Sequence, residues 1–235
     1  MKTYQQLIEG VYDPNIFKAF FMAGGRGSGK SRTVEKGLGQ SSGKISVTGT
    51  GLKIVNSDDV FEKYLKAAKL SFEMPFKQAQ MRDVRRAQAK AVTKKRFDNY
   101  VEGRLGLVID GTGKDYGKIT TDASNLKQIG YDVHMIFVNT SLEVALERNR
   151  ERGRMGGRTV PEKITTDAWK QVQANIGKFQ SFFGSKNFIV VDNNSKDDKI
   201  FDEVSKKIRG FLRNKVDNYI AKAWIAQQLR LHKRA

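Results

Sequence analysis

The chain has 235 residues, and 43 Lys and Arg against 25 Asp and Glu give it a formal net charge of +18 and an isoelectric point near 10.0. It is long enough to bury the core of one large domain. Its lack of cysteine excludes disulfides, zinc–thiolate sites and cysteine nucleophiles. The polar start lacks the apolar core of a signal peptide, and no stretch has the apolar length of a membrane span. We therefore expect a cytoplasmic protein without membrane contact.

The excess of basic residues favours a polyanionic partner, such as nucleic acid, an anionic surface or a phosphorylated substrate. A basic surface without a specific partner would have the same composition. Nucleic acid is the partner that the charge favours, and charge alone gives no sequence preference.

The first predicted elements surround a phosphate-binding motif. The apolar run Phe17–Ala23 predicts a strand, and Lys30–Leu38 predicts a helix. Between them the segment Gly24–Ser31 reads Gly-Gly-Arg-Gly-Ser-Gly-Lys-Ser, which matches G-x-x-x-x-G-K-S in the strand–loop–helix context that the motif requires. A glycine-rich turn with a chance lysine is the alternative. The motif predicts that the chain binds ATP.

In such a loop, backbone amides and the helix N-terminus surround an anion. Lys30 would reach the terminal phosphates, and the Ser31 hydroxyl would bind Mg²⁺. The residues expected to contact the nucleotide are Gly24, Gly25, Arg26, Gly27, Ser28, Gly29, Lys30, Ser31 and Arg32.

Beyond this loop, Gln40–Gly51 is rich in glycine and serine and predicts a hairpin or a loop. The next strand, Lys53–Val55, precedes two carboxylates, Asp58 and Asp59, at the start of a helix over Asp58–Leu70. One carboxylate could take the proton of an acceptor hydroxyl, and either could cap the helix.

The stretch Phe61–Arg104 predicts a basic helical insert with a long helix over Ala79–Val101. It is either a solvated helix face or a substrate-facing basic surface. Its clustered basic residues are Arg82, Arg85, Arg86, Lys90, Lys94, Lys95 and Arg96.

The third strand, Leu105–Ile109, leads directly into Asp110, at the strand end where open α/β sheets place their sites. Asp110 could hold Mg²⁺ through a water, or could only cap the turn before glycine. A helix over Ile119–Ile129 and a strand over Val133–Val138 follow.

The helix predicted over Leu142–Arg152 carries Arg148 and Arg152 four residues apart, on one face. Gly153 and the glycines after it predict that the helix breaks into a flexible arginine-bearing lid over about 148–160. Such a lid would neutralise charge during phosphoryl transfer. The alternative is an exposed basic helix end.

A helix over Glu162–Phe182 and a strand over Phe188–Val191 complete an alternating pattern. The pattern predicts an α/β fold: a P-loop NTPase-like three-layer sandwich with a mostly parallel central sheet, a helical insert and a long C-terminal helix. We expect a kinase domain over residues 1–198. Residues 199–235 form an amphipathic helical extension with an apolar stripe and a basic end.

The order of these motifs resembles the kinase domain of phage polynucleotide 5′-kinases and of their relatives, the zeta-toxin kinases. The resemblance spans about Phe17 to Phe183 and rests on the phosphate loop, Asn56–Asp59, Asp110-Gly-Thr and Glu147–Gly153 ahead of Val160-Pro161. It implies that Asp58 is the general base and that Arg148 and Arg152 contact the donor phosphates. It maps the loop lysine and serine to Lys30 and Ser31, and the acidic residue of the third strand to Asp110.

The resemblance implies transfer of the γ-phosphoryl group of ATP to a hydroxyl, preferably a nucleic-acid 5′-OH, in the host cytoplasm if a phage encodes the chain. Polynucleotide kinases carry an arginine three residues after the base, where this chain has Phe61. The acceptor could therefore be a small molecule such as a nucleotide sugar. A packaging motor ATPase and a nucleotide-binding protein without turnover are the other classes considered, and the oligomeric state stays open.

Overall fold

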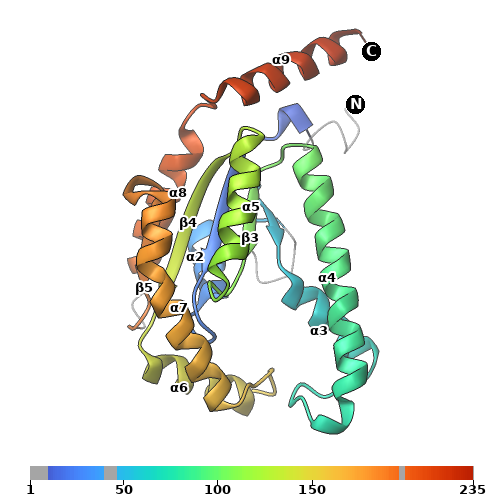
Figure 1. Cartoon of the computed structure of the whole chain (residues 1–235), viewed down its shortest axis with the longest axis vertical. Helices are drawn as coiled ribbons and strands as arrows, with labels where there is room; N and C mark the ends of the chain where they lie inside the picture. Colours follow the sequence, from blue (N-terminus) through green and yellow to red (C-terminus); the bar gives the residue numbers. More distant parts are fainter. Residues whose placement is uncertain (1–9, 40–46, 196–198, 235) are drawn as a thin grey trace.

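The computed structural model describes residues 10–39, 47–195 and 199–234. Its centre is a five-stranded sheet in the order β2-β3-β1-β4-β5, and each pair of neighbouring strands is parallel (Figure 1). The strands are β1 (Lys18–Ala23), β2 (Lys53–Val55), β3 (Leu107–Asp110), β4 (Asp132–Asn139) and β5 (Phe188–Asp192). The predicted parallel α/β sheet is confirmed.

Helices lie on both faces of this sheet (Figure 1). The helices of the described residues are α2 (Lys30–Leu38), α3 (Ser57–Ala67), α4 (Ala79–Glu102), α5 (Tyr116–Gln128), α6 (Leu142–Arg154), α7 (Glu162–Phe183), α8 (Lys199–Arg213) and α9 (Tyr219–Arg234), with short 3-10 turns η1 (Gly10–Tyr12), η2 (Phe76–Gln78) and η3 (Ser185–Asn187).

The two faces of the sheet bury separate apolar clusters, which explains why its strands are continuously apolar. In β1, Phe21 joins the cluster beneath α5 and α7, whereas Phe20 and Met22 join the cluster beneath α2 and α8. Adjacent side chains of a strand point to opposite faces, so a strand covered on both sides needs apolar residues at every position. The three-layer arrangement follows from this pattern.

Several helix ends differ from those predicted, and local capping explains two of them. The α3 helix starts at Ser57 because Asn56, not Asp58 or Asp59, is its N-cap and accepts a hydrogen bond from the Asp58 amide. The α5 helix starts at Tyr116 instead of Ile119 because Asp115 caps it. The α6 helix runs two residues beyond the predicted Arg152, through Gly153 to Arg154, and ends before Gly156, which has φ 74°. A glycine costs a helix only about 1 kcal/mol.

The predicted glycine- and serine-rich segment is only partly described. Residues 40–46 lie outside the described part of the chain, so the hairpin or loop predicted there is not addressed. Val47 forms one antiparallel bridge with Lys53 of β2.

The stretch predicted as a basic insert forms the connection from β2 to β3. It consists of α3, η2 and α4, which pack on each other around Val60, Phe61, Leu65 and Ala89. Long α4 buries only Ala89 and Thr93. Figure 1 shows the α3–α4 pair at one side of the molecule, opposite α6 and α7.

The C-terminal residues form two helices. Along α8, Phe201, Val204 and Ile208 are buried. In α9, Ala221 is buried and Trp224 packs edge-on against Phe17, at the end of the sheet where the strands begin. The far end of α9 leaves the core. No described helix has the length and apolarity that a membrane crossing needs.

Candidate active site

The phosphate loop lies between the end of β1 and the start of α2, and its glycines are required by close contacts. Gly27 has φ 76°, and a Cβ added there would lie 2.3 Å from the carbonyl oxygen of Ala145. Gly29 has φ 89° and immediately precedes α2 without capping it by a side chain. Glycine has no side chain that could cap the helix. Gly29 therefore does not occupy the first-turn amides of α2, which an anion bound at a helix N-terminus would use.

Asn193, directly after β5, is hydrogen-bonded to the phosphate loop. Its side-chain amide donates a 2.7 Å hydrogen bond to the carbonyl of Ser28, and Asn193 is buried. Sequence reasoning did not select Asn193, because the sheet order is what brings β5 to this side of the loop.

Lys30 folds back over its own loop. Its Nζ donates to the carbonyl of Gly24 at 2.8 Å and to that of Gly25 at 3.4 Å. Burial lowers the pKa of Lys30, and the carboxylates of Asp110 and Asp58 oppose that effect. These carbonyl oxygens are neutral acceptors. Phosphate oxygens are charged and accept more strongly, so a bound nucleotide would replace the carbonyls as partners of Lys30.

The remaining predicted nucleotide contacts occupy different sides of the loop. Ser31 is exposed at the start of α2. The guanidinium of Arg32 lies over the ring of Phe201 in α8, 5.6 Å from its centroid. The pKa of Arg26 is lowered by burial and next by the charge of Arg158.

Asp110 stands at the end of β3 with one oxygen shielded and unpaired. Its Oδ2 accepts a 2.9 Å hydrogen bond from Asn56, whereas its shielded Oδ1 has no hydrogen-bond partner in the part of the chain that is described. Burial raises the pKa of Asp110 to about 6, against the attraction of Lys30. An unpaired carboxylate oxygen beside a phosphate loop fits a Mg²⁺ ion or its bound water. The exposed Ser31 hydroxyl fits as the second protein ligand.

The carboxylate of Asp58 is paired with arginines from two other parts of the chain. Arg86 Nη1 of α4 donates to its Oδ1 at 2.5 Å, and Arg158 Nη2 of the α6–α7 loop donates to its Oδ2 at 3.0 Å. Burial alone would raise the pKa of Asp58, but Arg158 and Arg86 outweigh it and lower the pKa to about 2.

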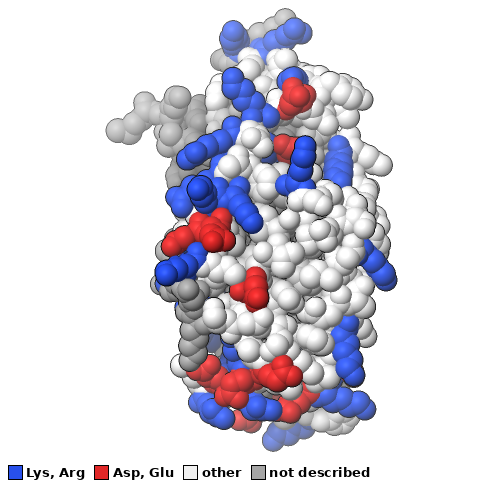
Figure 2. Space-filling view, turned by 90° about the vertical axis from the view of Figure 1, so that its left-hand side faces the viewer, with Lys and Arg blue, Asp and Glu red and all other residues white. Residues whose placement is uncertain are grey.

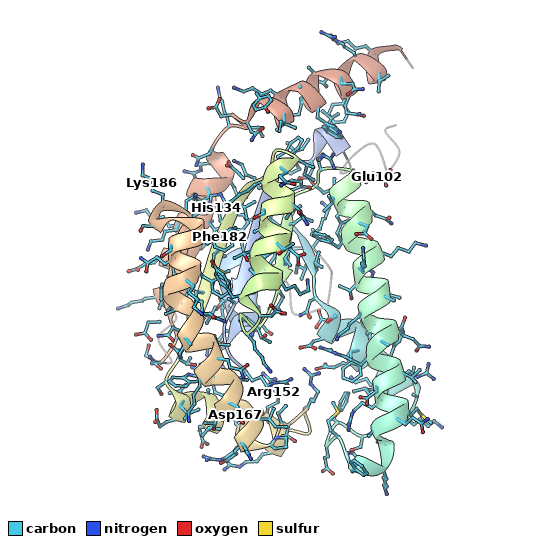
Figure 3. The ribbon with its side chains drawn as sticks, in the orientation of Figure 1. Glu102, His134, Arg152, Asp167, Phe182 and Lys186 are labelled. Atoms are coloured by element: carbon cyan, nitrogen blue, oxygen red, sulfur yellow. The ribbon has the colours of Figure 1, made fainter. Side chains whose placement is uncertain are left out.

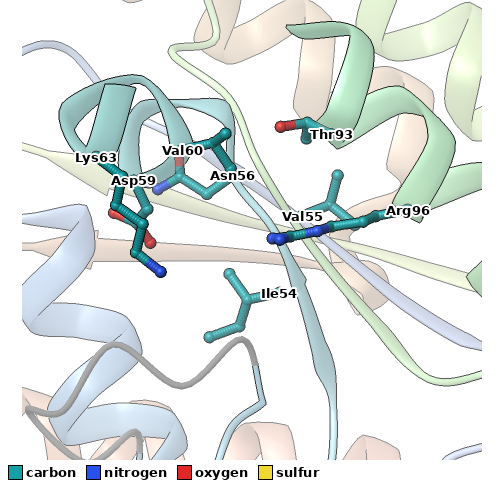
Figure 4. Close-up of a pocket in the computed structure, with 8 residues that line it drawn as sticks. All are labelled: Ile54, Val55, Asn56, Asp59, Val60, Lys63, Thr93 and Arg96. Carbon is teal, nitrogen blue, oxygen red and sulfur yellow. The ribbon is translucent and has the colours of Figure 1, made fainter. Parts of the chain in front are cut away.

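Asp59 lies beside Asn56, and its charge contributes to the raised pKa of Asp110 after burial and Asp58. Asp59 lines a small pocket formed by β2, α3 and α4, which Lys63 and Arg96 also line (Figure 4). The other lining residues are Ile54, Val55, Asn56, Val60 and Thr93. The structure thus pairs Asp58, which the resemblance selects as the base, with Arg86 and Arg158, whereas the charge of Asp59 acts on Asp110.

Both lid arginines predicted from the sequence lie on α6, next to the loop. Arg148 Nη1 lies 3.4 Å from the carbonyl oxygen of Gly27 and 3.5 Å from that of Ser28, which places it along the loop backbone. Arg152 is exposed, and its charge lowers the pKa of Lys30 and of Arg26. Figure 3 shows Arg152 at the end of the molecule where α6 and α7 approach the loop.

Sequence reasoning passed over two arginines that touch Asp58. Arg86 was one of several basic residues in the α4 stretch, and Arg158 was one of several in the lid segment. The spacing to Asp58, 28 and 100 residues respectively, gives no signal. Only the fold selects them.

Comparison with known proteins identifies the relatives of this site. The sequence model of the zeta toxin family matches residues 12–205. No curated protein sequence matches the chain. A candidate kinase from Chloroflexus aurantiacus j-10-fl has a similar fold, with a TM-score of 0.55 and 14% identity over 82% of this chain and 97% of that one.

A chain in the structure of the PezAT chromosomal toxin–antitoxin system of Streptococcus pneumoniae is also similar, with a TM-score of 0.51 and 15% identity over 84% of this chain and 86% of that one. These likenesses confirm the fold, and the family match extends from before β1 into α8. The chain therefore belongs to the zeta toxin family, and its sheet and phosphate loop are those of a kinase-like phosphotransferase.

Proposed function

We propose that the protein transfers the γ-phosphoryl group of ATP to a hydroxyl of an acceptor held beside Asp58. One observation carries this proposal, the position of the Asp58 carboxylate next to the phosphate loop. Its charge favours the protonated form of Lys30, against the effect of burial, and Arg86 and Arg158 bond to the carboxylate. A base at that place faces the end of a triphosphate bound by the loop.

The proposed step is a single displacement. The acceptor oxygen forms a bond to the γ-phosphorus, and the bond from that phosphorus to the β–γ bridging oxygen breaks, which releases ADP. The hydroxyl proton passes to the Asp58 carboxylate and then to solvent. Asp58 thus orients the acceptor and holds its proton.

Positive side chains would neutralise the charge on the transferring group. Lys30 reaches the terminal phosphates once it leaves the carbonyls of Gly24 and Gly25. Arg152 and Arg158 approach the same place from α6 and from the loop after it. Ser31 and Asp110 would hold Mg²⁺, which supplies further charge neutralisation when bound.

For the acceptor we favour a small molecule that carries phosphate, such as a nucleotide sugar. The guanidinium groups of Arg86 and Arg158 both bond to Asp58, and the pKa of Arg26 is lowered first by burial and then by Arg158, Arg86 and Arg152. The face in Figure 2, which is the side of the molecule away from α4, groups Lys and Arg in its upper part and mixes them with Asp and Glu at its lower end.

A nucleic-acid 5′-OH is the second candidate acceptor. The exposed basic residues of α4, which include Lys90, Lys94 and Arg96, favour it, together with the net charge of +18. Lys94 is already paired with Asp98 of the same helix, so α4 offers less free positive charge than its sequence suggests.

The test is a transfer assay with γ-labelled ATP and two acceptors, a nucleotide sugar and a 5′-OH oligonucleotide, with products separated by thin-layer chromatography. Label in the nucleotide sugar supports the favoured acceptor, and label only in the oligonucleotide supports the second. DNA-stimulated release of inorganic phosphate without a labelled acceptor would indicate a motor ATPase. Lys30→Ala should abolish whichever transfer is seen.

A further inference from the structure

Much of the positive charge of the chain lies beyond the part that the family model matches. That match ends at residue 205. Residues 206–235 hold nine Lys and Arg against a single Asp, so this short stretch contributes +8 to the net charge of +18. Every Lys and Arg whose side chain is described there is exposed. The transfer site uses none of these residues.

Three of these cations share one face of α8. Lys206, Arg209 and Arg213 recur at i, i+3 and i+7, a spacing that lines one side of a helix, and the opposite side packs on the sheet. Arg209 donates to the hydroxyl of Ser205, and none of the three has a carboxylate partner in the part of the chain that is described. Asp202 lies one turn before Lys206, so the face is cationic from Lys206 onward.

The cationic face continues into the connection from α8 to α9. Lys215 lies two residues after α8, and Lys222 is in the first turn of α9. Lys222 pairs at 2.5 Å with Asp217, the one acidic residue in 206–235. Because both side chains are exposed, this pair is weak, and a phosphate group can replace Asp217 as the partner of Lys222.

An aromatic ring stands among these cations. Tyr219 is 79% exposed and lies between Lys215 and Lys222 in the chain. Asn218 fixes the start of α9, because its side-chain oxygen accepts from the amide of Ile220 and its carbonyl accepts from the amide of Lys222. An exposed ring at a fixed place offers a surface on which an unpaired base can stack.

This connection lies at the opposite edge of the sheet from the phosphate loop. The α8 helix begins near the loop, where the guanidinium of Arg32 lies over Phe201, and ends near the strand starts, where Phe211 stacks on His134 of β4. Helix α9 crosses the edge where the strands begin (Figure 1). In Figure 2, Lys and Arg are grouped in the upper part, at the level of α9 in Figure 1. A ligand bound here leaves the phosphate loop open to ATP.

The chemistry of this surface fits a single-stranded nucleic acid better than a membrane. A helix that lies on a membrane inserts an exposed apolar face. The apolar face of α8 is buried, and Trp224 and Ile225 of α9 pack on the core. Cations along a surface bind the phosphates of a single strand, while an exposed ring stacks on a base. A duplex presents phosphates but keeps its bases stacked on one another.

We propose that a surface formed by α8, α9 and their connection, here called the α8–α9 surface, binds single-stranded nucleic acid and holds the enzyme on it. The residues of the α8–α9 surface are Lys206, Arg209, Arg213, Lys215, Tyr219 and Lys222. The nucleic acid is a docking partner at this surface, apart from the acceptor beside Asp58. The inference therefore goes beyond the proposed function and is independent of which hydroxyl is phosphorylated.

Fluorescence anisotropy with a labelled oligothymidylate of about 15 nucleotides tests the charge contacts. The oligonucleotide carries a 5′-phosphate, so it lacks the 5′-OH of an acceptor. The logarithm of the binding constant should fall against the logarithm of the salt concentration with a slope of about −3, as expected for four or five phosphate contacts on a single strand. Arg213→Gln combined with Lys215→Gln should reduce that slope by about 1.4. Binding that does not depend on salt would overturn the assignment.

Tyr219 is tested separately from the charges. Tyr219→Ala should weaken binding about tenfold at fixed salt and leave the slope unchanged, because stacking involves no phosphate contact. Tyr219→Phe keeps the ring and should bind as the wild type does. A duplex of the same length should bind the wild type and Tyr219→Ala equally. A Tyr219→Ala variant that binds the single strand normally would overturn the single-strand assignment, as would binding of phosphatidylserine vesicles in place of the oligonucleotide.

Lys90→Gln combined with Lys95→Gln is the matched control, since both lysines are exposed on α4 and the change in net charge is the same. This control should bind the oligonucleotide as the wild type does. A loss as large as that of the Arg213 and Lys215 variant would show that net charge, and not the α8–α9 surface, determines binding.

Lys30→Ala separates this inference from the proposed function. Measured without nucleotide, it should bind the oligonucleotide as tightly as the wild type, although it should lose transfer. Loss of oligonucleotide binding in Lys30→Ala would place the nucleic acid in the transfer site and overturn the α8–α9 assignment. Transfer by a wild-type protein that binds no oligonucleotide refutes this inference alone, and oligonucleotide binding without transfer to any acceptor refutes the proposed function alone.

Discussion

The side-chain amide of Asn56 donates a 2.9 Å hydrogen bond to Oδ2 of Asp110, which joins the ends of β2 and β3 beside the phosphate loop. The same Asn56 caps α3 through its Oδ1, which accepts from the amide of Asp58. One residue thus orients the candidate metal carboxylate and starts the helix that carries the candidate base.

Replacement of Asn56 should separate these two roles. Asn56→Ala removes cap and donor, and should lower the free energy of unfolding by about 1 kcal/mol. Asn56→Ser keeps a cap but loses the donor to Asp110, so stability should stay near that of the wild type. Both variants should need about tenfold more Mg²⁺ for half-maximal activity, because a ligand has lost its supporting hydrogen bond. Urea unfolding and Mg²⁺ titrations measure the two effects, and an unchanged Mg²⁺ requirement in Asn56→Ser would remove Asp110 from the metal site.

Asp58→Asn should reduce phosphoryl transfer by about 10²- to 10⁴-fold, the range that general-base catalysis contributes. Binding of an ATP analogue should survive, because Asp58 is bonded to arginines and not to the loop. Asp59→Asn is the matched control and should have a smaller effect, since Asp59 lines the neighbouring pocket and acts on Asp110 through its charge. A parallel loss of nucleotide binding in Asp58→Asn would reassign Asp58 to the metal or to the fold.

Arg152→Ala should slow turnover more than it weakens nucleotide binding. An arginine that neutralises the transferring group contributes about 10³-fold to the rate. Arg150→Ala is a suitable control on the same helix, because Arg150 pairs with Glu147 and Glu162 away from the loop. Single-turnover kinetics with an independent binding assay separate the two effects. A defect in binding alone would contradict the lid role.

His134 of β4 should make the fold sensitive to acid. It is 3% exposed between the rings of Phe20 and Phe211, and neither ring nitrogen has a hydrogen-bond partner among the residues described. Burial lowers its pKa to about 4. The unfolded chain therefore binds a proton at higher pH than the folded one, and stability falls as pH drops from about 6.5 to about 4, by roughly 3 kcal/mol.

Asp110 acts in the opposite direction over part of this window. Its pKa is raised to about 6, so its protonation in the folded state adds stability as pH falls through 6. The difference between the wild type and His134→Phe isolates the histidine, because both proteins contain Asp110. The advantage of His134→Phe should grow from pH 7 to pH 4 in urea unfolding. A difference independent of pH would show that His134 titrates normally.

The sequence alone determined the parts of this protein that are contiguous in the chain. The phosphate loop is a run of eight residues, and its strand and helix follow from continuous apolar and periodic patterns, so Lys30 and Ser31 could be assigned without coordinates. The parallel sheet followed from the alternation of such runs. The positions of Asp58 and Asp110 after their strands also followed, because parallel strands end at one edge of a sheet.

Tertiary structure alone decided which side chains meet at that edge. The residue pattern by itself leaves Asp58 and Asp59 as alternatives, and the pairing of α3 with α4 brings Asp58 to Arg86. Arg158 comes from 100 residues away, on the loop that leaves α6. The partner of a charged residue cannot be found from a periodic pattern in the sequence, since the strength of an ion pair depends on distance and burial in the folded protein. The site therefore becomes specific only when β2, β3 and α6 are placed around the loop.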